Sequence, residues 1–197
     1  MQDVFLQENL ALVDQELWRL LEESVHSFNT PFHTGAVATV FNNIPELRTV
    51  VLRRADAPGR KLFFHTDIRS PKVTHLQRQP ALSWLFYHAP SRIQLRCYAQ
   101  AQVHSIGPVA DYGWEQSRLS SRLCYTPADA PGTFLPAPVF TNLNRHTASP
   151  ELLETARRHF AVVETTVHAM DWVFLHHDGH RRAFFDYSNQ LFQWKQV

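Results

Sequence analysis

Residues 93–105 read Ile-Gln-Leu-Arg-Cys-Tyr-Ala-Gln-Ala-Gln-Val-His-Ser, and this stretch decides the fold class. Apolar side chains occupy every second position from Ile93 to Val103, and polar side chains fill the positions between them. Successive side chains of a strand point to opposite faces, so the alternation predicts a strand with one dry face and one polar face. Such a strand is typical of an antiparallel sheet that packs one side against a core.

Further strands are predicted on both sides of this stretch by short apolar, β-branched or aromatic runs. They cover residues 36–41, 47–54, 61–66 and 81–88 before it, and residues 172–176, 181–187 and 191–194 after it. Turn-forming residues separate them at Asn42-Asn43, Ala57-Pro58-Gly59, Asp178-Gly179 and Ser188-Asn189. The last three strands form a predicted C-terminal meander.

Helices are predicted between the strands. The first covers residues 14–28, where apolar residues share one face at helical spacing and Asp14 is the expected N-cap. Others are expected over 70–79, 108–122 and 149–161, two of which open on a Ser-Pro pair. The stretch 126–138 contains four prolines and is expected to be an ordered surface loop.

The order of these elements indicates a mainly β, α+β protein. Antiparallel strands alternate with short helices, without the regular strand–helix repeat that a parallel sheet requires. A closed or split β-barrel with flanking helices is the expected architecture, because closure removes exposed sheet edges. The 197 residues fit one domain, 1–197, with an N-terminal helix and the C-terminal meander.

Composition argues against several classes of protein. Nineteen basic and eighteen acidic residues give a net charge of +1, which is not the balance of a strongly basic nucleic-acid binder. No stretch approaches the ~18 apolar residues of a membrane span, and the N-terminus lacks the features of a signal peptide. Cys97 and Cys124 alone cannot form a disulfide framework or a four-cysteine zinc site. A cytoplasmic protein is therefore expected.

Ser70-Pro71-Lys72 is the first candidate for chemistry. A helix N-terminus carries free amide hydrogens and a partial positive charge, and a serine hydroxyl and a lysine ammonium beside it would favour a phosphate. An ordinary capped surface helix is the alternative interpretation. His65 and Thr66 end the preceding strand and are well placed to touch a ligand at this helix.

Two other strands carry polar residues that suit a flat, phosphorylated ligand. Arg48 opens the run Arg48-Thr49-Val50-Val51-Leu52-Arg53, and its guanidinium could reach the same phosphate while the backbone pairs with a ring edge. A basic edge strand is the alternative. Gln94 lies on the polar face of the long strand, and its carboxamide can both donate and accept hydrogen bonds.

In their order and spacing these runs resemble the pyridoxamine 5'-phosphate oxidase-like flavoproteins, which have the FMN-binding split-barrel fold. The runs are 48–53, 62–67, 70–72, 80–87 and 92–96, so the resemblance is best over residues 30–125. It implies that Arg48 and Lys72, helped by Thr66 and Ser70, hold the FMN phosphate. The cofactor-binding set that it implies is Arg48, Thr49, Val50, Val51, Leu52, Arg53, His65, Thr66, Ser70, Lys72, Gln94, Trp172 and Arg182.

The resemblance also implies a homodimer with the flavin between the subunits, and residues 117–122 as contacts from the partner chain. Two departures from the family pattern stand out, the first at the FMN phosphate and the second at the substrate. Pro71 replaces the arginine of the family's Ser-Arg-Lys motif, which leaves the neighbouring Arg69 to compensate, and Phe184 and Asp186 replace the histidine and last arginine of its C-terminal Arg-x-His-x-Arg element. An FMN-dependent oxidoreductase acting on a small metabolite other than pyridoxamine phosphate is therefore expected, with no catalytic residue assigned.

A split-barrel protein that binds flavin or haem without turnover is the alternative function. A metal site is not expected at His176-His177-Asp178, because neighbouring residues of a strand point to opposite faces. A flavin spectrum of the purified protein would discriminate the two functions, since flavin chemistry requires the cofactor.

Overall fold

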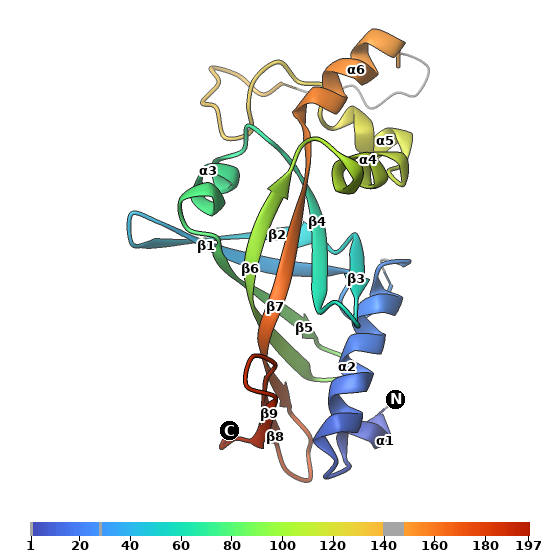
Figure 1. Cartoon of the computed structure of the whole chain (residues 1–197), viewed down its shortest axis with the longest axis vertical. Helices are drawn as coiled ribbons and strands as arrows, with labels where there is room; N and C mark the ends of the chain where they lie inside the picture. Colours follow the sequence, from blue (N-terminus) through green and yellow to red (C-terminus); the bar gives the residue numbers. More distant parts are fainter. Residues whose placement is uncertain (1, 28, 140–147) are drawn as a thin grey trace.

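One antiparallel sheet of nine strands forms the body of the protein, as seen in the computed structural model, which describes residues 2–27, 29–139 and 148–197 (Figure 1). The strands run in the order β2-β1-β5-β6-β7-β4-β3, with β8 beside β7 and β9 beside β8. Their bounds are β1 Thr34–Phe41, β2 Ile44–Val51, β3 Arg54–Asp56, β4 Lys61–Asp67, β5 Ala81–His88, β6 Ile93–His104, β7 Phe160–Phe174, β8 Arg181–Asp186 and β9 Leu191–Trp194.

The sheet curls into a split barrel because its two ends meet. Strand β2 continues into β3 after two residues, and β3 pairs with β4 at the other end of the strand order. The amide of Arg53 donates to the carbonyl of Phe63 at this junction (2.8 Å). The predicted fold class, a mainly β protein with flanking helices, is therefore confirmed.

The strand predictions agree with most of the sheet, but they miss the first half of β7. The predicted strands 81–88 and 191–194 match β5 and β9, and β6 is one residue shorter than predicted. The expected strand 172–176 is only the end of β7, which begins at Phe160. Residues 160–163 are all buried, so this part of the sequence has no alternation to detect. Strand β3 is also absent from the predicted strands.

Six helices flank the sheet in the described part of the chain: α1 Gln2–Phe5, α2 Leu10–Ser24, α3 Pro71–Arg78, α4 Pro108–Glu115, α5 Leu119–Leu123 and α6 Pro150–His159. The helix predicted over 108–122 is broken into α4 and α5, because Arg118 has an extended backbone. The helix predicted over 149–161 ends at His159, where β7 follows directly. No helix within the described ranges has both the length and the apolar character of a membrane crossing.

Helix α2 starts earlier than predicted. Asn9 is its N-cap, and its side-chain oxygen accepts hydrogen bonds from the amides of Ala11 and Leu12. Asp14, the predicted cap, is instead a buried residue of the second turn that accepts hydrogen bonds from the Tyr187 hydroxyl and from Arg60. The helix ends at Ser24, and Phe28 lies outside the described residues.

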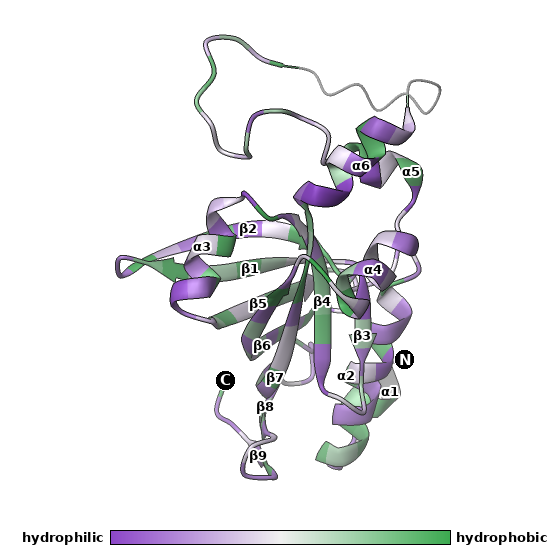
Figure 2. Cartoon of the chain, turned by 45° about the horizontal axis from the view of Figure 1, so that its top comes forward, coloured by the Kyte–Doolittle hydropathy of each residue, from purple (hydrophilic) through white to green (hydrophobic). Residues whose placement is uncertain are grey.

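Aromatic and aliphatic side chains fill the barrel. Figure 2 shows hydrophobic residues, in green, recurring along the strands. Trp84 on β5 lies fully buried between Phe64 and Phe86, with ring centroids 5.4 and 5.3 Å away. Its indole N–H donates to the hydroxyl of Thr165 on β7 (3.2 Å), and that hydroxyl donates to the carbonyl of Leu62 on β4 (2.7 Å). One buried hydroxyl thus links three strands.

Thr165→Val is expected to lower the free energy of unfolding by about 1–3 kcal/mol, because the Trp84 N–H and the Leu62 carbonyl would both lose a buried partner. Thr165→Ser keeps the hydroxyl and is the matched control. Urea denaturation of the three proteins measures the effect. An unchanged stability of the Val variant would contradict the role of this hydroxyl.

Candidate functional site

Lys72, Ser70 and Thr66 converge where β4 ends and α3 begins. The ammonium of Lys72 donates to the hydroxyl of Ser70 (2.5 Å) and to the hydroxyl of Thr66 (3.1 Å). Ser70 holds the N-cap position of α3, but its hydroxyl makes no capping bond and accepts from Lys72 instead. Both hydroxyl residues are buried. Two hydroxyls and one ammonium therefore meet at a helix N-terminus.

Arg48 on β2 points toward the same end of the barrel. Its guanidinium donates to the hydroxyl of Thr39 (2.6 Å) and to the carbonyl of Glu46 (3.0 Å), and it pairs with the Glu46 carboxylate (3.1 Å). Thr39 in turn lies 3.1 Å from Nδ1 of His75, a buried residue of α3. Arg48 is thereby connected to the helix that carries Lys72.

The two cations influence each other. Burial lowers the pKa of Lys72, and the charge of Arg48 lowers it further, whereas Asp67 opposes the shift. Burial also lowers the pKa of Arg48. Asp67 itself forms an ion pair with Arg69 (2.7 Å), so its carboxylate offsets the charge of Lys72 only in part. An anion placed between Lys72 and Arg48 would relieve their repulsion. Arg48, Thr66, Ser70 and Lys72 are named the phosphate seat below.

Arg69 is not available to replace the cation that Pro71 removes. Besides its ion pair with Asp67, its guanidinium donates to the backbone carbonyls of Pro127 (3.0 Å) and Ala128 (2.8 Å). These bonds hold the start of the proline-rich segment against the loop before α3. The side chain thus acts as a tether, and the seat relies on Arg48 and Lys72.

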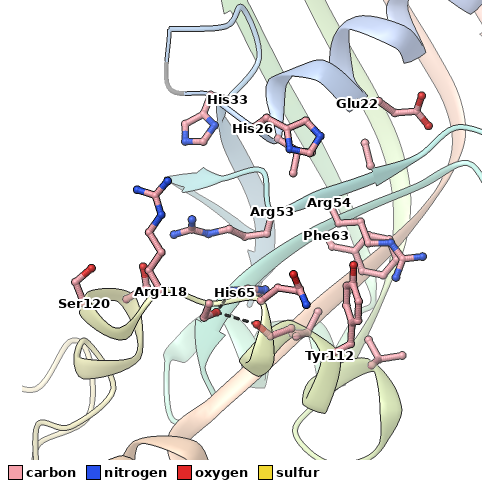
Figure 3. Close-up of a pocket in the computed structure, with 18 residues that line it drawn as sticks. Glu22, His26, His33, Arg53, Arg54, Phe63, His65, Tyr112, Arg118 and Ser120 are labelled. Atoms are coloured by element: carbon pink, nitrogen blue, oxygen red, sulfur yellow. Dashed lines mark hydrogen bonds between the residues drawn. The ribbon is translucent and has the colours of Figure 1, made fainter. Parts of the chain in front are cut away.

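A cavity of about 660 Å³ opens on the other face of β4, among β3, α4, α5 and the end of α2 (Figure 3). Arg53, Arg54 and Arg118 contribute cations to its lining, and Arg53 and Arg118 extend toward one another in the close-up. Among its described lining residues, Glu22 is the one carboxylate. The cavity is therefore suited to anionic groups.

His65 lies in this cavity as a neutral base. Burial, together with the charge of Arg53, lowers the pKa of His65 to about 3. The Ser117 hydroxyl donates to the carbonyl of Gly113 (2.8 Å) and lies 3.3 Å from Nδ1 of His65. Since that hydroxyl hydrogen is already used, Nδ1 is the donor and Nε2 keeps a free lone pair.

Gly113 permits this arrangement. A Cβ at this position would lie 2.5 Å from Cγ2 of Val162 and 3.2 Å from Nε2 of His65. Only glycine therefore lets α4 pack so close to the sheet beside His65. Sequence reasoning missed Gly113, Tyr112 and Arg54, because the cavity draws on six separate elements. It expected 117–122 only as contacts to a partner, whereas Ser117, Arg118, Ser120 and Ser121 line this chain's own cavity.

The predicted cofactor-binding residues fall into four places. Arg48, Thr66, Ser70 and Lys72 form the seat, and Arg53 and His65 line the cavity. Between them on β2 and its end, Thr49 is exposed, Val50 and Val51 are half-buried and Leu52 is fully buried. Gln94, Trp172 and Arg182 lie instead toward the end of the molecule that carries β8 and β9, away from α3 (Figure 1).

Trp172 and Arg182 have structural partners. Trp172 is fully buried against Phe5 and Phe174, so it exposes no surface to a ligand in this chain. Arg182 pairs with Asp171 (2.9 Å) on the outer face of the sheet. Burial opposes the charge of Asp171, but hydrogen bonds from Arg182 and Lys195 and the charge of Arg96 hold its pKa below the usual range. Three cationic side chains therefore share the single carboxylate of Asp171.

The reason given against a metal at His176-His177-Asp178 is wrong. Strand β7 ends at Phe174, so the two histidines lie in a turn and not on a strand. Their ring centroids are 4.1 Å apart, and the ligand atoms of the three residues all lie within 4.8 Å of one another.

Acidification is expected to destabilise the protein through His65. Its pKa is 6.5 in an unfolded chain and about 3 in the fold, so below pH 6.5 the unfolded chain takes up a proton that the folded chain does not. This costs up to about 1.4 kcal/mol per pH unit. Urea denaturation at pH 7 and pH 5 should show a smaller loss for His65→Gln than for the wild type. His168→Ala, at an exposed histidine, should behave like the wild type; equal losses in all three would contradict the assignment.

Comparisons with known proteins agree with this geometry. Residues 15–105 match the family model described as pyridoxamine 5'-phosphate oxidase, FMN-binding domain. A pyridoxamine 5'-phosphate oxidase-related, FMN binding protein from Nostoc punctiforme PCC 73102 shares the fold with a TM-score of 0.73 at 20% identity, over 93% of this chain and 96% of that chain. No functionally curated protein matches the chain.

Two more solved structures share the fold. PhzG from Burkholderia lata 383, solved with tetrahydrophenazine-1-carboxylic acid, has a TM-score of 0.67 at 16% identity, over 93% of this chain and 90% of that chain. A general stress protein 26-related protein from Clostridium acetobutylicum has a TM-score of 0.57 at 11% identity, over 90% and 99%. Residues 15–105 thus resemble the FMN-binding domain of pyridoxamine 5'-phosphate oxidase, and the chain has the split-barrel fold of its structural neighbours.

Proposed function

We propose that this protein is a cytoplasmic FMN-dependent oxidoreductase that acts on a small metabolite other than pyridoxamine phosphate. The observation that carries the proposal is the meeting of Lys72 and two buried hydroxyls at the N-terminus of α3, near enough to Arg48 for its charge to act on Lys72. Two half-buried cations that repel each other favour a dianion such as the phosphate of FMN. The exclusion of pyridoxamine phosphate rests on Phe184 and Asp186 in the C-terminal element.

The donor set of the seat fits the FMN phosphate. Lys72 and Arg48 would neutralise its charge, and Ser70 and Thr66 would donate hydroxyl hydrogens once the phosphate replaces them as partners of Lys72. At the start of α3, Pro71 has no amide hydrogen and the amides of Ser70 and Val73 donate to the carbonyls of Asp67 and Ser70, so the amide of Lys72 is the one that would add to the site. The backbone of residues 50–53 would meet the ring edge. Bound FMN supplies hydride transfer, while the protein orients it and the substrate.

The cavity beside the seat is suited to the substrate. Thr66 belongs to the seat and its neighbour His65 lines the cavity, so β4 separates the two by the thickness of one strand. Arg53 and Arg118 would bind a carboxylate or phosphate of the substrate. His65 stays neutral at physiological pH because its pKa is lowered to about 3, so its Nε2 can accept a hydrogen bond from the substrate.

Replacing both cations of the seat, Arg48→Ala with Lys72→Ala, is expected to weaken FMN binding at least about 100-fold, because each charged hydrogen bond contributes about 1.5–3 kcal/mol. The visible spectrum of the purified protein and a titration of the flavin-free protein with FMN measure the effect. Arg78→Ala removes a cation from the far end of α3 and is the control, with wild-type affinity expected.

Equal FMN affinity of the double variant and the wild type would contradict the seat. A purified protein that carries no flavin and binds none would contradict the proposed function. If the seat binds FMN but no small amine, aldehyde or nicotinamide changes the redox state of the flavin, the alternative of a cofactor-binding protein without turnover would be favoured.

We propose further that the protein is a homodimer in which each flavin contacts both subunits. Gln94, Val173 and Arg182 align in one row across β6, β7 and β8, on a half-buried outer face. This face lies away from α3 within one chain (Figure 1). Gln94 and Arg182 can therefore serve a flavin only if they belong to the other subunit from the seat.

Light scattering should give a mass about twice the 22.8 kDa of one chain. A mixture of two variants tests whether each flavin site is shared between the subunits. The seat double variant and Arg182→Ala should each bind FMN poorly, but one of the two sites in their mixed dimer would combine an intact seat with an intact Arg182. Refolding the two together should therefore restore binding to a fraction of the sites. A monomeric mass, or no restoration, would contradict the shared site.

A further inference from the structure

The turn between β7 and β8 carries three imidazoles and one carboxylate in the run His176-His177-Asp178-Gly179-His180. We propose that His176, His177 and Asp178 bind a divalent transition-metal ion, with Zn²⁺ as the best-matched one. The proposal does not rest on the proposed flavin chemistry, and the turn lies at the end of the chain opposite α3 and the phosphate seat (Figure 1). Imidazole nitrogens and a carboxylate oxygen are ligands that Zn²⁺ commonly takes from proteins.

The spacing of the ligand atoms fits a shared ion. Metal–ligand distances of about 2.0–2.2 Å place neighbouring ligands of a tetrahedral zinc about 3.3 Å apart. Oδ2 of Asp178 lies 3.2 Å from Nε2 of His177 and 3.7 Å from Nδ1 of His176. Small side-chain rotations are therefore enough to bring the three atoms around one ion. Three protein ligands leave a position for water, as in zinc sites that are open to solvent.

Much of this arrangement exists before any ion binds. The side chain of His176 is only 14% exposed, and its ring packs against Phe174 with centroids 5.3 Å apart. Its Nδ1 accepts a hydrogen bond from the amide of Asp178 (3.2 Å), which directs the lone pair of that nitrogen toward the turn. A metal ion bound to Nδ1 would replace this hydrogen bond from the amide of Asp178.

The backbone of the turn is also fixed. The amide of Gly179 donates to the carbonyl of His176 (3.2 Å), and Gly179 has φ of +133°, which glycine adopts without strain. The amide of Leu175 donates to the carbonyl of Arg92 (3.0 Å). The turn therefore presents its side chains from a defined conformation.

Charge and access favour a cation at this turn. The side chains of His177 and Asp178 are 72% and 76% exposed, so an ion can reach them without any opening of the fold. Arg181, the next cation along the chain, directs its guanidinium to the carbonyl of Gln7 (3.2 Å). Its charge is thereby held by the N-terminal segment.

Titration of metal-free, full-length protein with Zn²⁺ by calorimetry tests the site, and the visible absorption of added Co²⁺ reports its coordination. We expect one saturable ion per chain at this turn. Since even outer-shell partners of metal sites are worth about 10- to 100-fold in affinity, His177→Ala and Asp178→Asn should each weaken binding by at least about tenfold. Both residues are exposed, so the variants should fold normally.

His168→Ala is the matched control, because His168 is an exposed histidine of β7 outside the turn. It should bind Zn²⁺ like the wild type. The same affinity in the His177 and Asp178 variants as in the wild type would place the ion elsewhere and overturn the proposal. A wild-type protein that takes up no Zn²⁺ would overturn it as well.

Discussion

The packing of α3 across one end of the barrel is the contact on which the candidate site depends. Leu76 is buried in the barrel core, and Val73 and His75 are buried beside it, so the axis and the height of the helix are determined by the core. This position aims the N-terminus of α3 at the end of β4 and at Arg48. On the surface, a helix of the same sequence would be an ordinary capped helix, which is the alternative interpretation of Ser70-Pro71-Lys72.

Two places in the structure gather cations, and they differ in how the charge is compensated. At Asp171, three cationic side chains surround one buried carboxylate that holds them on the sheet. At the seat, Asp67 is shared with Arg69 and Glu46 pairs with Arg48 from a partly exposed position. Lys72 is left with hydroxyl partners alone. A structural cluster carries its own counter-charge, whereas a binding site leaves part of it to the ligand.

Alternation and capping patterns predict the parts of this protein whose structure is determined locally. Strand β6 and the start of α3 at Pro71 follow from a few neighbouring residues, and so does the nomination of Lys72. The first half of β7 could not be predicted, because burial on both faces removes the period. Asp14 has the chemistry of a cap, yet its partners Tyr187 and Arg60 are distant in the sequence.

The cavity and the metal-ligand cluster show the same limit for sites. The sequence spacing does not indicate that Arg53 and Arg118 line the same cavity. Their proximity depends on the break between α4 and α5, which sets the position of α5. The strand rule does not apply to His176 and His177, because β7 already ends at Phe174 and not at residue 176 as predicted.

The tether made by Arg69 affects how a ligand can arrive. It fastens Pro127 and Ala128 beside the loop before α3, and a Cβ at Gly132 would lie 3.6 Å from the ring of Pro71. The proline-rich segment therefore covers one flank of the helix tip. A ligand therefore has to approach the tip from a flank that this segment leaves uncovered.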